Sequence, residues 1–263
     1  METKAALVRR PGARLAEGIV THIARAPLDL ALAMQQWEGY VAVLRGEGWS
    51  IVEVPPAPDC PDAVFIEDAV VMFRGVAVIT HPGAEARRPE TLEVARVVAS
   101  LGYPIRSIVA PGTLDGGDVL KVGDTVYVGR GGRSNDEGIR QLRAILAPLG
   151  ATVVAVPLGE VLHLKSAVTA LPDGTILGWA PVVDDATLFP RFLSVPEESG
   201  AHVVLLGEGR LLMAGDCPQS AQMFRALGYT PVPVDISEFV KLEGCVTCLS
   251  VRLREHADPR ETP

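Results

Sequence analysis

One order of secondary structure recurs along this chain: two short strands around a tight turn, then a helix, then a third strand. It is clearest where Gly123-Asp124 separates strands predicted over 118–122 and 125–128, before a helix over 136–149 and a strand over 152–156. Tight Gly/Asp turns between apolar runs are typical of antiparallel hairpins. The same order begins again near residues 65, 166 and 202, with a weaker, Pro-containing helix in the copy that begins at 166.

The two ends of the chain together supply a fifth copy. Residues 245–253 predict its first strand, and residues 5–8, 28–44 and 50–54 predict its second strand, helix and third strand. One unit cannot bury its own apolar face, whereas stacked neighbours can. Five ββαβ units therefore predict a closed α/β ring with pseudo-five-fold symmetry, in one domain over 1–263. A two-domain parallel α/β protein is the alternative, which the hairpin turns disfavour.

The composition narrows the classes of function. Hydrophobic residues make up 48% of the 263 residues, and the net charge of −8 argues against nucleic acid and anionic membranes as partners. No apolar run approaches the ~20 residues of a membrane span, and the first apolar run, closed by Arg9 and Arg10, is no signal-peptide core. Because four cysteines do not make a disulfide framework in a chain this long, we expect reduced thiols and a cytoplasmic location.

Polar residues stand at equivalent places, where the first strand of four units begins. Singly, each has an ordinary explanation, since Asp-Gly-Gly is a turn signal and a lone His is often solvated or structural. Pseudo-symmetry would bring them to one end of a central channel, where buried charge is unfavourable unless it is paired or used. They are Asp62, Glu67 and Asp68 in the first unit, Asp115 and Asp118 in the second, His163 in the third and Cys248 in the last.

The cysteines of the last unit have a structural and a chemical interpretation. The β-branched, apolar run from Cys245 to Val251 predicts a strand, on which residues three apart face opposite sides. Cys245 and Cys248 would then bind one metal ion poorly and be badly placed for a disulfide. Cys248 is either a small buried hydrophobe or a nucleophile, whose thiolate needs a nearby positive charge. Carboxylates beside a thiolate suit a planar guanidinium better than an ester or a peptide.

Five segments jointly resemble the dimethylarginine dimethylaminohydrolases of the pentein, or guanidine-modifying, superfamily. The likeness runs in order from about residue 5 to residue 253 and implies a five-bladed αβ propeller around a small channel. It also implies hydrolysis of Nω-methylated arginine to citrulline and dimethylamine or methylamine, through a Cys-bound thiouronium, without a metal or organic cofactor. The segments are Phe-Ile-Glu-Asp (65–68), Thr-His-Pro-Gly-Ala-x-x-Arg-Arg (80–88), Leu-Asp-Gly-Gly-Asp-Val-Leu (114–120), His-Leu-Lys-Ser (163–166) and Thr-Cys-Leu-Ser-Val (247–251).

Matched position by position, the resemblance implies roles for the polar residues. Cys248 looks like the nucleophile, His163 like the general acid and base, and Asp115 like the third catalytic carboxylate. Asp68 looks like the carboxylate that holds the guanidinium nitrogens. Asp62 resembles the family residue near the α-amino group of the substrate.

The resemblance also implies where the rest of the substrate is held. Arg87 and Arg133 resemble two arginines that bind the α-carboxylate, a task suited to the planar guanidinium fork; the structural alternative is a solvated surface arginine. Ile19 falls where the family has a mobile lid, in a loose alignment. Leu242 would contribute a backbone carbonyl only, and Glu67 lies near the site without an assigned role.

Two other functions stay open: an arginine deiminase-like hydrolase acting on unmethylated arginine or agmatine, and a non-catalytic pentein binding module. Deiminases usually carry an extra helical insertion, and a binding module has no reason to keep Cys, His and carboxylates together. We expect a small-molecule substrate and leave a homodimer open. Cys60, Cys217 and Cys245 are expected to be bystanders, and the tail 254–263 is expected to be poorly ordered.

Overall fold

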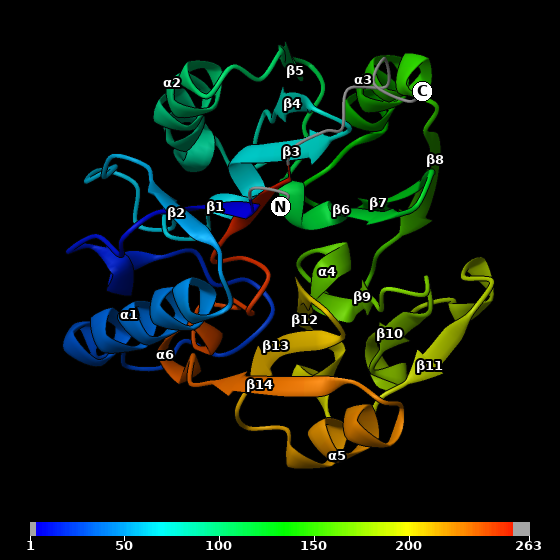
Figure 1. The fold of residues 1–263 in the computed structure, drawn as a ribbon. Coiled ribbons are helices and arrows are strands. Elements are labelled where there is room, and N and C mark those ends of the chain that lie inside the picture. Colours follow the sequence, from blue (N-terminus) through cyan, green and yellow to red (C-terminus); the bar gives the residue numbers. More distant parts are fainter. Residues whose placement is uncertain (1–3, 255–263) are drawn as a thin grey trace.

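The computed structural model describes residues 4–254 and confirms the ring of five units (Figure 1). Each unit is a three-stranded sheet whose second strand is antiparallel to the first and parallel to the third. The expectation for the C-terminal tail concerns mainly residues 255–263, which lie outside the described residues. None of the helices within residues 4–254 has both the length and the apolar character that a membrane crossing requires.

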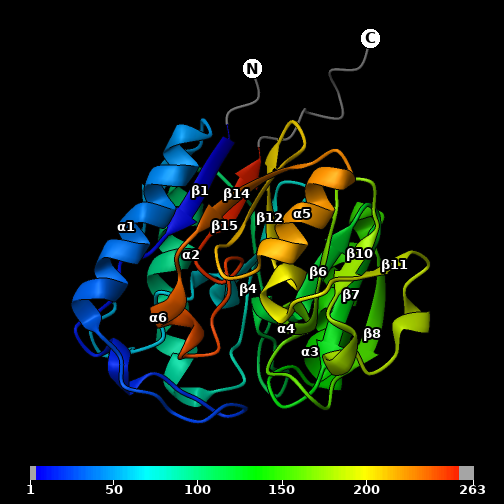
Figure 2. The ribbon, with the colours of Figure 1, turned by 90° about the horizontal axis from the view of Figure 1, so that it is seen from below.

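The strands follow the repeat that the sequence predicts. Four units are continuous in the chain, and the remaining one joins the first two strands of the chain to the last. In that split unit Ala5 pairs with Leu253, and Figure 2 shows the two strands side by side. The units are β15 (Val251–Arg254), β1 (Lys4–Val8) and β2 (Ser50–Glu53); β3 (Val70–Phe73), β4 (Val76–Ile79) and β5 (Ile105–Ser107); β6 (Val119–Val122), β7 (Thr125–Arg130) and β8 (Thr152–Pro157); β9 (Val168–Ala170), β10 (Ile176–Gly178) and β11 (Phe192–Ser194); and β12 (Val203–Gly207), β13 (Arg210–Ala214) and β14 (Thr230–Val234).

Helices cover the outside of the ring, and apolar side chains fill the space between neighbouring units. Four units carry an outer α-helix: α1 (Leu30–Gly46), α2 (Thr91–Ser100), α3 (Asp136–Leu146) and α5 (Pro218–Ala226) (Figure 1). Buried clusters bridge consecutive units; one joins Leu7 of the split unit to Val70 of the next. Because each unit buries apolar side chains against its neighbours as well as against its own helix, closure of the ring completes the hydrophobic core.

The unit of β9, β10 and β11 departs from the repeat. The weak helix predicted there is replaced by two short 3₁₀ helices, Ala180–Val182 and Ala186–Leu188. Pro181 stands in the first of them, and the carboxylate of Asp185 accepts the backbone N–H of Thr187, closing a local turn at 2.9 Å. Such local side-chain bonds compete with a continuous helix.

Short turns precede the first strands and carry the polar residues. The 3₁₀ helices Ile66–Ala69 and Gly116–Asp118 precede β3 and β6, and the helix α4 (Leu164–Ala167) precedes β9. The prediction of a strand from residue 245 is wrong, because turns occupy residues 246–249 and β15 begins only at Val251. Tyr40 on α1 holds this turn, with its hydroxyl 2.9 Å from the carbonyl of Val246 and 2.7 Å from Oγ of Ser250.

Candidate active site

Eight of the ten predicted site residues line one small cavity of ≈ 20 Å³. The turns before β3, β9 and β15 converge on it, together with the 3₁₀ helix Glu85–Glu90 that carries Arg87, the loop that carries Arg133 and the segment around Ile19. Asp115 lies behind the cavity, fully buried, and Glu67 faces elsewhere. The eight are Ile19, Asp62, Asp68, Arg87, Arg133, His163, Leu242 and Cys248.

His163 sits between two carboxylates. Its Nε2 lies 3.0 Å from Oδ2 of Asp115 and 3.8 Å from Oδ1 of Asp68. Burial alone would favour the neutral ring, but the charge of Asp68 and the hydrogen bond to Asp115 prevail and raise the pKa of His163 to about 9. The ring is therefore an imidazolium at neutral pH, able to donate a proton inside the cavity.

Asp68 is fixed by a buried ion-pair network. Its Oδ2 lies 2.5 Å from Nη1 of Arg87, and its Oδ1 accepts the N–H of Gly117 at 2.8 Å. Although burial opposes ionisation, His163 and Arg87 hold the pKa of Asp68 well below its usual range. Arg87 also pairs with Glu90 at 2.8 Å, a partner that the motif alone does not reveal. Asp68 is thus a permanent anion with a fixed orientation.

Two glycines let the turns approach one another. A Cβ on Gly117 would lie 2.7 Å from both Oδ1 of Asp68 and Nδ1 of His163, and one on Gly116 would lie 2.0 Å from the carbonyl oxygen of Glu67. No side chain fits at either place without moving a buried carboxylate, the imidazole or the backbone. The Asp-Gly-Gly segment is therefore a packing requirement of the site as well as a turn.

Asp118 ties three parts of the site together, a role that the sequence did not reveal. Its Oδ1 accepts the N–H of Leu164, next to His163, at 3.0 Å, and its Oδ2 lies 2.5 Å from Oγ of Ser134. That hydroxyl also accepts the N–H of Asp115 at 3.1 Å. Burial raises the pKa of Asp118 to about 6. Its position, three residues after Asp115 and just before a strand, is the only sequence signal for this function.

Of the two arginines that line the cavity, Arg133 has the nitrogen without a hydrogen bond. Its side chain is 10% exposed and its Nη1 lies 3.6 Å from Oδ2 of Asp115, too far for a good hydrogen bond. That nitrogen is buried and has no hydrogen-bond partner among the described residues. Arg87, in contrast, donates from all three of its nitrogens. The cavity therefore contains one buried cationic donor that is available to an anionic group.

The segment around Ile19 covers the cavity. The N–H of Ile19 lies 3.0 and 3.2 Å from the two carboxylate oxygens of Asp62. Glu243 accepts the N–H groups of Thr21, His22 and Ile23, at 3.0 Å and 3.2 Å for the first and the last. A cavity of ≈ 20 Å³ holds little more than one water molecule, so an amino acid can enter only if this segment moves.

Cys248 has a second thiol as its neighbour, which corrects the prediction that strand geometry keeps Cys245 away. The two Sγ atoms lie 3.4 Å apart, because the turn closes with a hydrogen bond of 3.1 Å from the N–H of Cys248 to the carbonyl of Cys245. The hydrogen bond between the sulfurs lowers the pKa of Cys245 to about 5 and raises the pKa of Cys248. The contact between the sulfurs thus favours the loss of one of the two protons of the pair.

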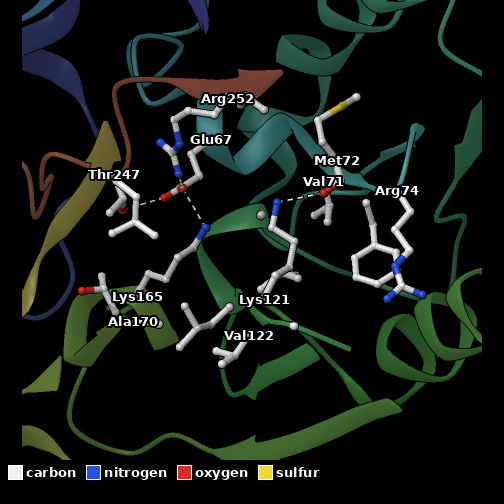
Figure 3. A pocket seen from close by; sticks show the side chains of 18 of the residues that line it. Glu67, Val71, Met72, Arg74, Lys121, Val122, Lys165, Ala170, Thr247 and Arg252 are labelled. Atoms are coloured by element: carbon white, nitrogen blue, oxygen red, sulfur yellow. Dashed lines mark hydrogen bonds and ion pairs between the residues drawn. The ribbon is translucent and has the colours of Figure 1, made fainter. Parts of the chain in front are cut away.

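Glu67 faces the other side of the ring. It lies in a wide, open cavity of ≈ 570 Å³, with Lys165 at 2.7 Å, Oγ1 of Thr247 at 2.8 Å and Arg252 at 3.6 Å (Figure 3). Only its backbone reaches the nucleophile, through a hydrogen bond of 3.2 Å from its N–H to the carbonyl of Cys248. Glu67, which the sequence put near the site without a role, does not line the small cavity; its side chain supports the turn through Thr247.

Asp68, Asp115 and His163 form a group whose ligand atoms lie within 4.8 Å of one another, a spacing that a metal ion could bridge. Their charges are already balanced, since Arg87 contacts Asp68 and the imidazolium lies between the carboxylates. A protonated histidine cannot ligate a metal. The group is therefore better suited to proton transfer, and the prediction of a metal-free site stays a prediction.

Known proteins place the chain in a family. An N(G),N(G)-dimethylarginine dimethylaminohydrolase from Streptomyces coelicolor is 64% identical over 258 residues, which cover 98% of this chain and 100% of that protein. The chain belongs to the dimethylarginine dimethylaminohydrolase family. Another member, from Pseudomonas aeruginosa, is 36% identical over 94% of this chain and 98% of that protein. No protein-family model matches the chain.

Solved structures of the dimethylarginine dimethylaminohydrolase family agree with this fold. A Cys-to-Ser mutant of the enzyme from Pseudomonas aeruginosa, complexed with citrulline, has a TM-score of 0.89 at 34% identity and covers 96% of this chain and 100% of its own. A His-to-Gly variant of a family enzyme, in an adduct with S-methyl-L-thiocitrulline, also has a TM-score of 0.89, at 33% identity over 95% of this chain and 100% of its own. The N-terminal domain of a cyanobacterial arginine dihydrolase, at 19% identity and a TM-score of 0.82, shares the fold.

Proposed function

We propose that this protein hydrolyses Nω-methylated arginine to citrulline and dimethylamine or methylamine, with Cys248 as nucleophile. One arrangement carries the proposal: the thiol of Cys248, an imidazolium and a permanent carboxylate meet in one cavity, and the thiol of Cys245 lies directly behind that of Cys248. The close similarity to the Streptomyces coelicolor enzyme supports the same reaction class. The 19%-identical arginine dihydrolase bears on the fold alone.

The first half-reaction builds a covalent intermediate. The sulfur of Cys248 attacks the guanidinium carbon, whose nitrogens are held by Asp68 through charge-assisted hydrogen bonds. Because the substrate cation favours a thiolate beside it, the proton of Cys248 passes to Cys245 across the 3.4 Å contact between the sulfurs. His163, kept protonated by Asp115, donates its proton to the departing amine. The S–C bond has formed, the C–N bond to the amine has broken, and a thiouronium remains.

The second half-reaction releases the product. His163, now neutral, takes a proton from water, whose oxygen attacks the thiouronium carbon. The S–C bond breaks, the electron pair returns to Cys248, the hydroxyl proton of the product passes to solvent, and citrulline leaves. The raised pKa of His163 suits both steps, because the ring begins protonated and is a strong base once it has lost its proton.

The rest of the substrate meets complementary groups. We assign the α-carboxylate to Arg133, whose Nη1 makes no hydrogen bond among the described residues and is only 3.6 Å from Asp115. Asp62 is placed to bind the α-ammonium, since it now accepts only the N–H of Ile19 from the covering segment. The substrate would thus replace Ile19 at Asp62 as that segment opens. Arg87 can bind the α-carboxylate only by giving up one of its present partners. Its predicted role there is therefore less well supported than that of Arg133.

A comparison of turnover on four separate substrates tests the proposal. The protein is incubated separately with asymmetric dimethylarginine, monomethylarginine, arginine and agmatine, and citrulline and the released amines are quantified by mass spectrometry. We expect citrulline with dimethylamine or methylamine from the first two, and little product from the others. Citrulline and ammonia from arginine at a comparable rate would contradict the preference for methylated arginine. The cytoplasmic location and a homodimer stay predictions, to be tested by fractionation of the source cells and by sedimentation.

A further inference from the structure

We propose that Cys245 and Cys248 form a reversible disulfide that switches the enzyme off under oxidation, making Cys245 a redox modification site. The inference begins with geometry. The two Sγ atoms lie 3.4 Å apart, and a disulfide needs about 2.0 Å between sulfurs. The remaining gap of roughly 1.4 Å is within the reach of small side-chain rotations.

The backbone already satisfies the other requirement of a disulfide. The N–H of Cys248 donates to the carbonyl of Cys245 at 3.1 Å, which closes a four-residue turn. A turn of this kind keeps its first and last Cα atoms less than ~7 Å apart, and disulfides span Cα distances of about 4.4 to 6.8 Å. Oxidation therefore requires no refolding of the turn, which Tyr40 holds at both Val246 and Ser250.

The other cysteines lack this arrangement. The thiol of Cys217 donates to the carbonyl of Ala214 at 3.1 Å, and that of Cys60 lies 3.9 Å from the carbonyl of Ala86. Neither has a sulfur neighbour in the part of the chain that the structure describes. The pair in the active site is thus the place where a two-electron oxidation can be completed within one protein molecule.

The chemistry balances with a peroxide as the oxidant. The thiolate of the pair attacks a peroxide oxygen, which forms a sulfenic acid and releases the other oxygen as hydroxide, which takes a proton from solvent to become water. The second thiol attacks the sulfenyl sulfur, the S–O bond breaks, and the S–S bond forms with the loss of a second water. Two electrons pass from the sulfurs to hydrogen peroxide. Since Cys248 can no longer attack a guanidinium carbon, turnover stops.

The disulfide is also accessible for reduction. Cys245 lines a separate cavity of ≈ 520 Å³, whose lining includes Trp179, His202 and Gly244 but neither Asp68 nor His163. A small thiol entering there can attack the sulfur of Cys245, which forms a mixed disulfide and expels Cys248 as a thiolate. A second thiol then releases Cys245. The small cavity at Cys248 admits a molecule the size of water or peroxide, whereas the larger cavity at Cys245 admits a thiol.

This inference rests on the proposed function only for its effect on turnover, because the disulfide itself is measured without substrate. Trypsin should release Leu242–Arg252, which contains both cysteines, as one peptide. The full-length protein is treated with hydrogen peroxide, unfolded in iodoacetamide, digested and mapped by mass spectrometry. We expect this peptide to lose two hydrogens and carry no label, while the peptide of Cys217 is labelled. After dithiothreitol, the peptide should carry two labels, and the citrulline-forming activity, reduced at least ~10-fold by peroxide, should recover.

Two variants separate the disulfide from other damage. In Cys245→Ala, peroxide should carry Cys248 on to the sulfinic acid, visible as two added oxygens that dithiothreitol does not remove. In the matched variant Cys217→Ala, the disulfide should form as in the native protein. The proposal is overturned if the native protein yields Leu242–Arg252 with two labels after peroxide, or with sulfinic acid on Cys248 and a label on Cys245. These outcomes are independent of turnover, so failure of the proposed reaction would be recognised separately.

Discussion

Replacing Asp115 by Asn should lower the pKa of His163 without changing the shape of the site. In the native protein the Nε2 of His163 lies 3.0 Å from the carboxylate of Asp115, and its pKa is raised to about 9. A hydrogen bond to a charged group contributes about 1.5 to 3 kcal/mol, and each pKa unit corresponds to about 1.4 kcal/mol. The substitution should therefore lower the pKa by about one to two units, to roughly 7 to 8, because Asp68 remains 3.8 Å away.

The assay is an NMR titration of the histidine ring protons between pH 5 and 10. The resonance of His163 is assigned by its absence in His163→Asn, and each histidine reports its own pKa. A matched control is Asp136→Asn, which removes an exposed carboxylate at the start of α3 that pairs with Arg130. That variant should leave the pKa of His163 unchanged.

Two results would refute the reasoning. If His163 titrates near 6.5 in the native protein, burial outweighs the carboxylates and the ring is neutral during turnover. If Asp115→Asn leaves a high pKa in place, the charge that sustains the imidazolium lies elsewhere, with Asp68 as the first candidate.

Further predictions concern packing, binding and stability. Gly117→Ala places a Cβ 2.7 Å from the His163 ring and should lower kcat at least ~10-fold. The control Gly132→Ala, which has open space around it, should leave kcat unchanged. Equal effects of the two substitutions would refute the packing argument. Arg133→Lys should raise KM for methylated arginine about 10- to 100-fold with a smaller change in kcat, as measured by steady-state kinetics. An unchanged KM would show that Arg133 does not bind the α-carboxylate. Because the folded pKa of His163 is raised from 6.5 to about 9, its stabilisation, about 3 kcal/mol, is complete below pH 6.5 and lost as the pH rises through 9. Urea unfolding at pH 6.5 and 9.5 checks this by comparison with His163→Asn, whose stability should lack that component.

The repeat could be predicted because its turns and helix ends depend on local sequence. Tight turns such as Gly123-Asp124 and helix stops such as Gly150, which has a left-handed backbone at φ 80°, depend on backbone conformations that few residues adopt. Position in the repeat then predicted which polar residues converge, and four of them, Asp62, Asp68, His163 and Cys248, line one cavity. Convergence followed from symmetry, without any knowledge of side-chain contacts.

The errors arose where tertiary contacts override local preference. The run from Cys245 has the composition of a strand, yet the hydroxyl of Tyr40, more than 200 residues away, holds it as a turn. Glu67 and Asp68 are adjacent in a 3₁₀ helix and therefore point to different sides, so only Asp68 lines the small cavity. The partnership of Arg87 with Glu90 depends on burial, which one sequence does not reveal.

The most direct test is to trap the covalent intermediate. The protein is mixed with asymmetric dimethylarginine, quenched in acid within milliseconds to seconds, digested with pepsin and mapped by mass spectrometry. We predict a transient mass increase on the peptide that contains Cys248, equal to the substrate less dimethylamine, and its absence in Cys248→Ser. Turnover without any adduct, an adduct on another residue, or citrulline formation by Cys248→Ser would contradict the assignment of Cys248 as the nucleophile.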